Sequence, residues 1–191
     1  MKRTIGLAVA VALSMGMMTS ASASTPKLSS ELLTIGQMPT GWNVDNSSGG
    51  GGVGCLANIL ESKGIKPTAY AKVVFDDNGS TPLLDQAVAT YPSAKTGYTK
   101  IVARLSACKQ VSGTSGGTKA TGTVGQMSFP HYGNASAAFS VSLVIQHTNV
   151  VEDLLIVRKG TVVMGIAEAD LPPVDTSQFQ GFVVKALAKV K

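Results

Sequence analysis

The most reaction-like motif of the chain is Gly113-Thr-Ser115-Gly-Gly117, which matches the G-x-S-x-G pattern of serine hydrolases. A nucleophile elbow needs a strand, a turn and a helix in succession, and a triad in the chain order Ser, Asp, His. Here a strand-like segment follows the motif, and neither Asp nor Glu occurs between Ser115 and His147. The motif therefore indicates a low-complexity Ser/Gly/Thr loop rather than a catalytic serine.

The two histidines, His131 and His147, do not complete a catalytic or metal-binding arrangement. A trypsin-like protease needs its histidine before its serine in the chain, whereas both histidines follow Ser115. His131 lies in a Pro-His-Tyr turn, and His147 ends an apolar strand pattern. We therefore predict a turn imidazole and a satisfied strand-end imidazole, and no metal site.

Acidic residues gather at predicted strand ends, as Glu152-Asp153 and as Glu168 with Asp170. Paired-carboxylate hydrolysis requires two such groups about 5–10 Å apart across a cleft, and the sequence favours solvated loops instead. The turn Asp76-Asp-Asn-Gly79 lacks the spaced ligands and closing Glu of a calcium loop. We predict no catalytic residue, no metal and no cofactor, and hence a non-enzymatic protein.

Cys55 and Cys108 are the only cysteines of the chain. In an exported protein a disulfide between them is the default, and two free thiols or a metal-binding pair are the alternatives. Two lone cysteines without clustered histidines are a poor metal signal. A bridge closing this loop would stabilise the fold by roughly 4 kcal/mol in the chain-entropy account.

The N-terminus, Met1–Ala23, has the pattern of an export signal. Lys2 and Arg3 form a charged start, Ile5–Met18 is an apolar core, and Ala21-Ser22-Ala23 fits the small-x-small cleavage rule. An anchor helix is the alternative, but this core is shorter than the roughly 20 residues that span a bilayer. We predict cleavage after Ala23 and a secreted or cell-wall-associated protein without a membrane span.

Composition and charge indicate one modest domain. Removing Lys2 and Arg3 from the 16 basic residues leaves 14 against 11 acidic residues, a net charge of +3. The basic residues are scattered, with no cluster longer than Arg158-Lys159 and few aromatics, so nucleic-acid binding is not expected. We expect a monomeric single domain over residues 32–191, preceded by a flexible lead over residues 24–31.

The segment Ala135–Ala169 predicts a three-strand meander. Its first strand alternates apolar and polar residues, and turns are predicted at Thr148-Asn149 and Lys159-Gly160. In the second and third strands the apolar residues no longer alternate cleanly, which indicates cover on both faces of the sheet.

Two helices are predicted to provide that cover. One begins at the N-cap Ser93 and carries the apolar stripe Ala94, Tyr98, Ile101, Leu105 and Cys108. The other begins at Asp175, with Gln178 completing a capping box and Val174 stapled to Phe179. Its stripe is Phe179, Phe182, Val183, Ala186, Leu187 and Val190.

The remaining segments complete an α+β domain with an antiparallel sheet of about 6–7 strands flanked by two main helices. Val111–Ala120 reads as a loop, and Asn46–Gly52 as a mobile glycine-rich loop. Further strands are predicted at Trp42–Val44, Thr68–Phe75, Leu83–Tyr91 and Thr121–Phe129, and a helical turn at Cys55–Glu61.

Several of these segments together resemble the actinobacterial PknH-like extracellular (sensor) domain family. They are Leu32-Leu33-Thr34 leading to Met38-Pro-Thr-Gly-Trp42, the Ser/Gly loop before Cys55, Ala89-Thr-Tyr-Pro92, Ala107-Cys108, Thr121-Gly-Thr-Val with Met127-Ser-Phe-Pro130, and Arg158-Lys159-Gly160. The resemblance implies a freestanding secreted member with an antiparallel sheet flanked by helices and a cleft for an envelope ligand. Kinase-attached members carry two disulfides, whereas this chain can form only one.

The sequence therefore favours a secreted, non-enzymatic binding or sensor-like module for a small or lipidic ligand of the cell envelope. The candidate ligand contacts are Trp42, His131 and Tyr132. For Trp42, the only tryptophan, the sequence favours packing in the core, and ligand stacking is the alternative. Two other functions stay open: a protein-interaction factor without a ligand cavity, and an envelope hydrolase using His131 or His147.

Overall fold

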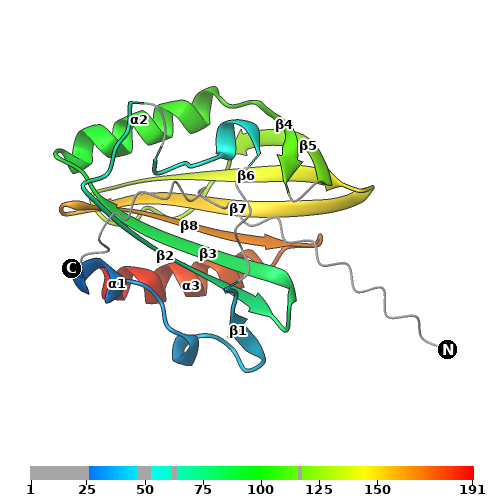
Figure 1. The fold of residues 1–191 in the computed structure, drawn as a ribbon, viewed down its shortest axis with the longest axis horizontal. Helices are drawn as coiled ribbons and strands as arrows, with labels where there is room; N and C mark the ends of the chain where they lie inside the picture. Colours follow the sequence, from blue (N-terminus) through cyan, green and yellow to red (C-terminus); the bar gives the residue numbers. More distant parts are fainter. Residues whose placement is uncertain (1–25, 47–52, 62–63, 116–117) are drawn as a thin grey trace.

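A computed structural model describes residues 26–46, 53–61, 64–115 and 118–191. Eight antiparallel strands form one sheet in the order β1-β2-β3-β8-β7-β6-β5-β4. Helices lie on both faces, with α2 on one side and α1 and α3 on the other (Figure 1). The predicted export signal and the glycines 49–52 lie outside the described residues. The bounds of the strands are β1 (Trp42–Val44), β2 (Ala69–Asp77), β3 (Ser80–Thr90), β4 (Gln110–Ser115), β5 (Thr118–Gln126), β6 (Ala135–Ile145), β7 (Thr148–Lys159) and β8 (Val162–Asp170).

The structure has fewer helical elements than strands. The main helices are α2 (Ala94–Ala107) and α3 (Thr176–Lys189), and α1 (Pro26–Ser29) is a single turn. Two 3₁₀ turns, η1 (Ile35–Gln37) and η2 (Gly54–Leu56), complete the set. Among the described residues, none of these helices has the length and apolarity that crossing a bilayer requires.

The antiparallel sheet with two main helices confirms the predicted α+β architecture, but the strand count exceeds the expected 6–7. The additional strand is β4, which runs through the segment interpreted as a Ser/Gly/Thr loop. Its backbone pairs with β5 from Gln110↔Thr123 to Ser115↔Thr118. Small residues are poor strand formers in isolation, and here β4 is held at the sheet edge by its ladder with β5 and by η2 beside it.

The C-terminal meander β6–β7–β8 is confirmed, with one turn displaced. Ile145 pairs with Thr148, so the β6–β7 turn is Gln146-His147 rather than Thr148-Asn149. Both turn residues have positive φ, 47° and 69°, which is the backbone that a two-residue hairpin with the sheet's twist requires. His147 is consequently exposed in a turn and does not end the apolar strand.

The strand β8 occupies the middle of the sheet although it is last in the chain. It pairs with β3 on one side and with β7 on the other. Alternate side chains of each strand face opposite layers. On β3, Leu83 and Ala87 join the apolar cluster beneath α2, and Leu84 and Val88 join the cluster beneath α3. We call these two sides of the sheet the α2 face and the α3 face.

The helix α3 covers the α3 face with the stripe predicted from sequence. Phe179, Phe182, Val183 and Ala186 are buried, and the Asp175 side chain caps the helix by accepting from the Ser177 and Gln178 N–H groups at 2.9 and 3.2 Å. The expected capping box is only half present. The Gln178 amide donates to Glu168 Oε1 at 2.6 Å instead of reaching back to the cap.

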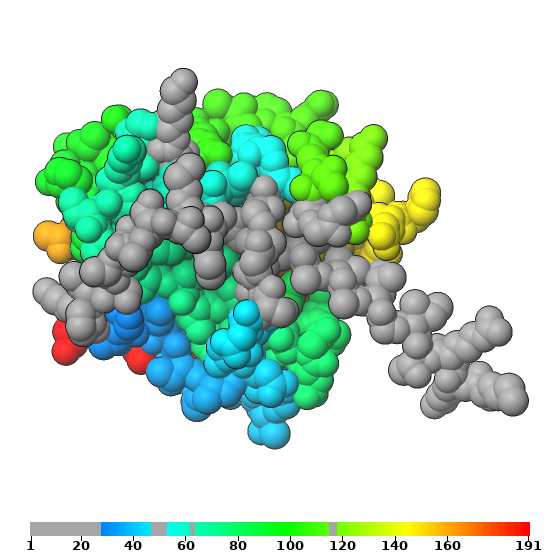
Figure 2. Space-filling view, in the orientation of Figure 1, coloured from blue at the N-terminus to red at the C-terminus, as the bar shows by residue number. Residues whose placement is uncertain are grey.

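The N-terminal segment also packs on the α3 face. The expected lead, residues 24–31, includes the helical turn α1, and Leu28 is buried there with Leu32 and Leu33. The Gln86 side chain of β3 fixes this segment, since it accepts from Leu33 N–H at 2.6 Å and donates to the Glu31 carbonyl at 3.3 Å. Figure 2 shows the N-terminal segment in blue on the side of the molecule opposite α2.

Candidate functional site

A short segment before β2 lies over the α2 face. Residues Val53–Glu61, here called the cover segment, include η2 and bury Leu56, Ile59 and Leu60. The segment lies beside α2 and β4 (Figure 2, cyan). Links to neighbouring elements hold this segment in position.

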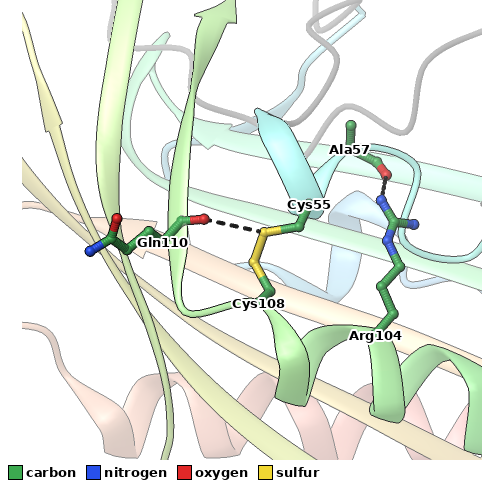
Figure 3. The surroundings of a disulfide bond; sticks show 5 residues. All are labelled: Cys55, Ala57, Arg104, Cys108 and Gln110. Atoms are coloured by element: carbon green, nitrogen blue, oxygen red, sulfur yellow. Dashed lines mark hydrogen bonds between the residues drawn. A yellow bond between two sulfur atoms is a disulfide. The ribbon is translucent and has the colours of Figure 1, made fainter.

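The first of those links is the disulfide between Cys55 and Cys108, whose Cα atoms are 6.0 Å apart. Cys108 is the C-cap of α2, so the bridge joins the end of that helix to the cover segment. Arg104, one turn earlier, donates to the carbonyls of Ala57 and Asn58 at 2.6 and 3.3 Å (Figure 3). These charge-assisted bonds satisfy carbonyls of a segment that has little regular structure of its own.

Tyr91 links the cover segment to the other end of α2. Its hydroxyl donates to the Leu60 carbonyl at 2.7 Å. A Cβ at Gly97 would lie 2.8 Å from the Tyr91 ring, so glycine is required there for the ring to lie against α2. The cover segment is thus attached near both ends of the helix.

Beneath the cover segment, the sheet presents a floor of small residues. On the α2 face Ala87 pairs with Gly165 and Asp85 pairs with Ala167 across β3 and β8. A Cβ built on Gly165 would lie 3.8 Å from Leu60 Cδ2, which places the cover segment directly above this point. The floor comprises Ala87, Ala89, Gly165, Ala167 and Ala169.

Polar side chains border this floor. On β2, the alternation that places Tyr70 on the α2 face also places Lys72 there. Lys72 Nζ lies 3.1 Å from Asp85 Oδ2 in an ion pair, and Asp85 is 6 % exposed. Burial raises the pKa of Asp85 to about 6 in spite of Lys72, which acts in the opposite direction. Burial also raises the pKa of Tyr70, and the charges of Asp85 and Glu61 add to that shift.

Glu152 approaches the same floor from β7. It is 2 % exposed, lies between Val141 of β6 and Ala169 of β8, and its Oε1 atom has no hydrogen-bond partner. Burial raises the pKa of Glu152 well above its ordinary value, and the negative charges of Asp85 and Asp153 raise it further. The expectation that Glu152 lies in a solvated loop is wrong, because β7 continues through this position as a central strand.

A second acidic pair lies on the α3 face. Asp153 and Glu168 are cross-strand partners and both are buried, which again corrects the expectation of solvated loops. Each is hydrogen-bonded, Glu168 to Gln178 of α3 and Asp153 to Ser140 of β6. Burial raises the pKa of Glu168 to about 7, against the opposing effect of the Gln178 hydrogen bond. Glu168 fastens α3 to the sheet through this bond, although its Oε2 atom, like Glu152 Oε1, has no hydrogen-bond partner.

The candidate contacts named from sequence lie elsewhere. Trp42 packs its ring 5.3 Å from that of Phe182 on the α3 face, and it is buried. Tyr132 is half-buried on the same face, with its ring 6.1 Å from Phe129. His131 is exposed in the loop between β5 and β6. The structure therefore does not bring these three residues to the floor beneath the cover segment.

The first three residues of the G-x-S-x-G motif, Gly113 to Ser115, lie on β4, and Gly116-Gly117 lie outside the described residues. Gly113 and Thr114 pair with Ala120 and Lys119 of β5. The motif thus precedes an antiparallel strand instead of the helix that a nucleophile elbow requires. Within the described ranges, no group of three or more His, Cys, Asp or Glu side chains is arranged to hold a metal ion.

Sequence reasoning missed Asp85 and Glu152 as site residues. The available signal was an acidic residue within an apolar stretch: Asp85 follows Leu83-Leu84, and Glu152-Asp153 lies between Val150-Val151 and Leu154-Leu155. A charge within such a run is costly to bury unless it has a partner or a purpose. Which of two adjacent polar residues faces which layer depends on strand register, which the sequence pattern alone leaves open.

Comparison with known proteins identifies the fold. No protein-family model matches the chain, and a search of curated proteins finds no match. Among solved structures, the chain is similar to the extracellular domain of PknH from Mycobacterium tuberculosis, with a TM-score of 0.60 and 14 % sequence identity. The match covers 85 % of this chain and 94 % of that one, so the two share a fold.

Proposed function

We propose that this protein is an exported, non-enzymatic binding module of the bacterial cell envelope, a freestanding member of the PknH-like extracellular domain family. Its ligand is a small or lipidic envelope molecule. The ligand binds on the α2 face, between the cover segment and the floor formed by β3 and β8.

One observation carries the binding function: Glu152 has a buried carboxyl oxygen without a partner. A buried polar atom without a hydrogen-bond partner destabilises the fold by about 1–3 kcal/mol. Such atoms are expected mainly where a functional site needs them. The neighbouring Asp85, Lys72 and Tyr70 give the same region a polar border around a floor without large side chains.

The extracellular location has separate support. The fold is that of an extracellular domain over 85 % of the chain, and the Cys55–Cys108 disulfide suits an oxidising compartment. The non-enzymatic part of the proposal rests on His131 and His147, which are exposed in loops on different hairpins and do not lie against the buried carboxylates.

Native mass spectrometry tests this function on mature protein purified from its own culture supernatant. We expect a stoichiometric adduct that is released on denaturation. The denatured, unreduced mass should also correspond to cleavage after Ala23 and to the two-hydrogen deficit of one disulfide.

A bare native mass would reject a resident ligand and favour a protein-interaction factor. In that case a pull-down from the culture medium, with the reduced protein as control, would be the next measurement. Turnover of an envelope substrate that is lost in a His131→Ala or His147→Ala variant would instead show a hydrolase.

A further inference from the structure

Among the described residues, the charges beneath the cover segment do not balance. Asp85 and Lys72 form one ion pair, while Glu152 adds a second carboxyl on the same face for which the described residues supply no cation. The described charges that act on the pKa of Glu152, those of Asp85 and Asp153, are both negative. Ionised, the set of Asp85, Glu152 and Lys72 would carry one net negative charge in a buried region.

The register places the two carboxyl groups toward a common point. Asp85 pairs with Ala167, and Glu152 pairs with Ala169 two residues along the same strand. Their strands are separated only by β8, and with the offset of two residues along the strands the two backbones are about 12 Å apart, within reach of a common ligand for an Asp and a Glu side chain. The β8 residues between them on this face are alanines, and no larger side chain of that strand separates the two groups.

We propose that Glu152 and Asp85 bind the positively charged amino group of a ligand, a primary ammonium, above Ala167 and Ala169. An ammonium carries one positive charge and three hydrogen-bond donors. It would supply a donor to Glu152 Oε1 and another to Asp85 Oδ1, both of which are buried oxygens without a hydrogen-bond partner. This inference rests on the proposed binding function and names the chemistry of its ligand.

A divalent metal ion fits the same place less well. Calcium and magnesium take six or more oxygen ligands in proteins, and within the described ranges no group of three or more acidic, His or Cys side chains is arranged for a metal. The positive charge of Lys72 beside Asp85 would also repel a divalent cation more strongly than a monovalent ammonium. The apolar neighbours Leu83 and Leu154 suit an aliphatic chain attached to the amine.

The test uses the intact mature protein and octylamine, which is an octylammonium ion at neutral pH. Isothermal titration should show binding of octylammonium, with neither octanoate nor octanol binding at the same concentration. The Glu152→Gln variant should weaken octylammonium binding about 10-fold or more, as expected for the loss of one charge-assisted hydrogen bond. Asp85→Asn should weaken it as well.

The matched control is Glu168→Gln, which changes a buried carboxylate on the α3 face whose charge is not among those that act on the pKa of Glu152, and it should leave octylammonium affinity within about 2-fold. Circular dichroism verifies folding of each variant. If a variant does not fold, the amine site is tested by whether the unmodified protein binds octylammonium and not octanoate. Equal binding of octanoate, or unchanged affinity in folded Glu152→Gln, overturns the amine site.

These outcomes separate the two proposals. A native adduct without an amino group that persists in Glu152→Gln protein overturns the amine site and leaves the binding function standing. A bare native mass with Glu152-dependent octylammonium binding rejects the resident ligand and supports the amine site.

Discussion

The two faces of the sheet hold their buried polar side chains to different degrees. On the α3 face, Gln86 is hydrogen-bonded to the N-terminal segment, and Glu168 is bonded to Gln178 of α3 through Oε1 while its Oε2 atom has no partner. On the α2 face, Glu152 has an oxygen with no partner, and Asp85 has one ion pair to offset its burial. The hydrogen bonds on the α3 face tie a helix and the N-terminal segment to the sheet, whereas the carboxyl of Glu152 on the α2 face has no such structural bond to explain its burial.

The largest change in unfolding free energy should appear when apolar packing on the α3 face is removed. Phe179 is fully buried, and its ring lies 5.3 Å from that of Phe129. Phe179→Ala should lower the free energy of unfolding by about 3–5 kcal/mol, because it deletes contacts and leaves a cavity. Val184→Ala, at an exposed position of the same helix, is the control and should change it by less than about 0.5 kcal/mol. Urea denaturation measures both, and equal effects would show that α3 is not packed as described.

The next largest change in unfolding free energy should come from removing a buried polar side chain that has hydrogen-bond partners, Gln86. Gln86→Leu would leave the Leu33 N–H and the Glu31 carbonyl without the side chain that they bond to. We expect a loss of about 2–4 kcal/mol in unfolding free energy, since each buried backbone group costs about 1–3 kcal/mol when unsatisfied. Gln126→Leu, at an exposed position of β5, is the matched control. A neutral result for Gln86→Leu would mean that the N-terminal segment is not held by this side chain.

Glu168 should make the attachment of α3 dependent on pH. Its pKa is raised from 4.5 to about 7 in the folded protein, so the native state keeps a proton that the unfolded chain releases between these values. The stabilisation is therefore present below pH 4.5 and is lost as the pH rises to 7, a difference on the order of 2 kcal/mol. Glu168→Gln should remove that part of the decline in unfolding free energy from pH 5 to 7.5. Identical pH profiles for the two proteins would contradict the assignment.

The smallest change in unfolding free energy should be a stabilisation. Glu152→Leu replaces a buried carboxyl that has an unpartnered oxygen, and we expect the unfolding free energy at pH 7.5 to rise by about 1 kcal/mol. The same substitution on the α3 face, Glu168→Leu, removes the acceptor of Gln178 and is the comparison. Destabilisation by Glu152→Leu would remove the distinction between the faces, because Glu152 would then behave as a structural residue.

Much of the fold could be predicted because its signals are local. The meander, the Ser93 cap of α2 and the buried stripe of α3 depend on residues within a few positions of one another. The pairing of Cys55 with Cys108 was predictable because no other cysteine exists.

What could not be predicted depends on partners distant in the sequence. β4 becomes a strand only through β5 and the neighbouring η2. Glu152 and Asp85 face the same layer because β8 is inserted between β3 and β7, a strand order that periodicity does not specify. Trp42 was a candidate contact on residue type alone, and its environment is the aromatic ring of Phe182.

The central position of β8 has a consequence for the assembly of the nascent chain. The ladder β1–β3 and the ladder β4–β7 can each form as soon as their residues are made, but they join only through β8. Ala87, for example, pairs with Gly165, 78 residues later in the chain. Until residues 162–170 are available, β3 and β7 present two open, apolar strand edges that favour aggregation. The protein therefore completes its sheet only after β8 has been made, and a chain kept unfolded until then does not expose these paired but open strand edges.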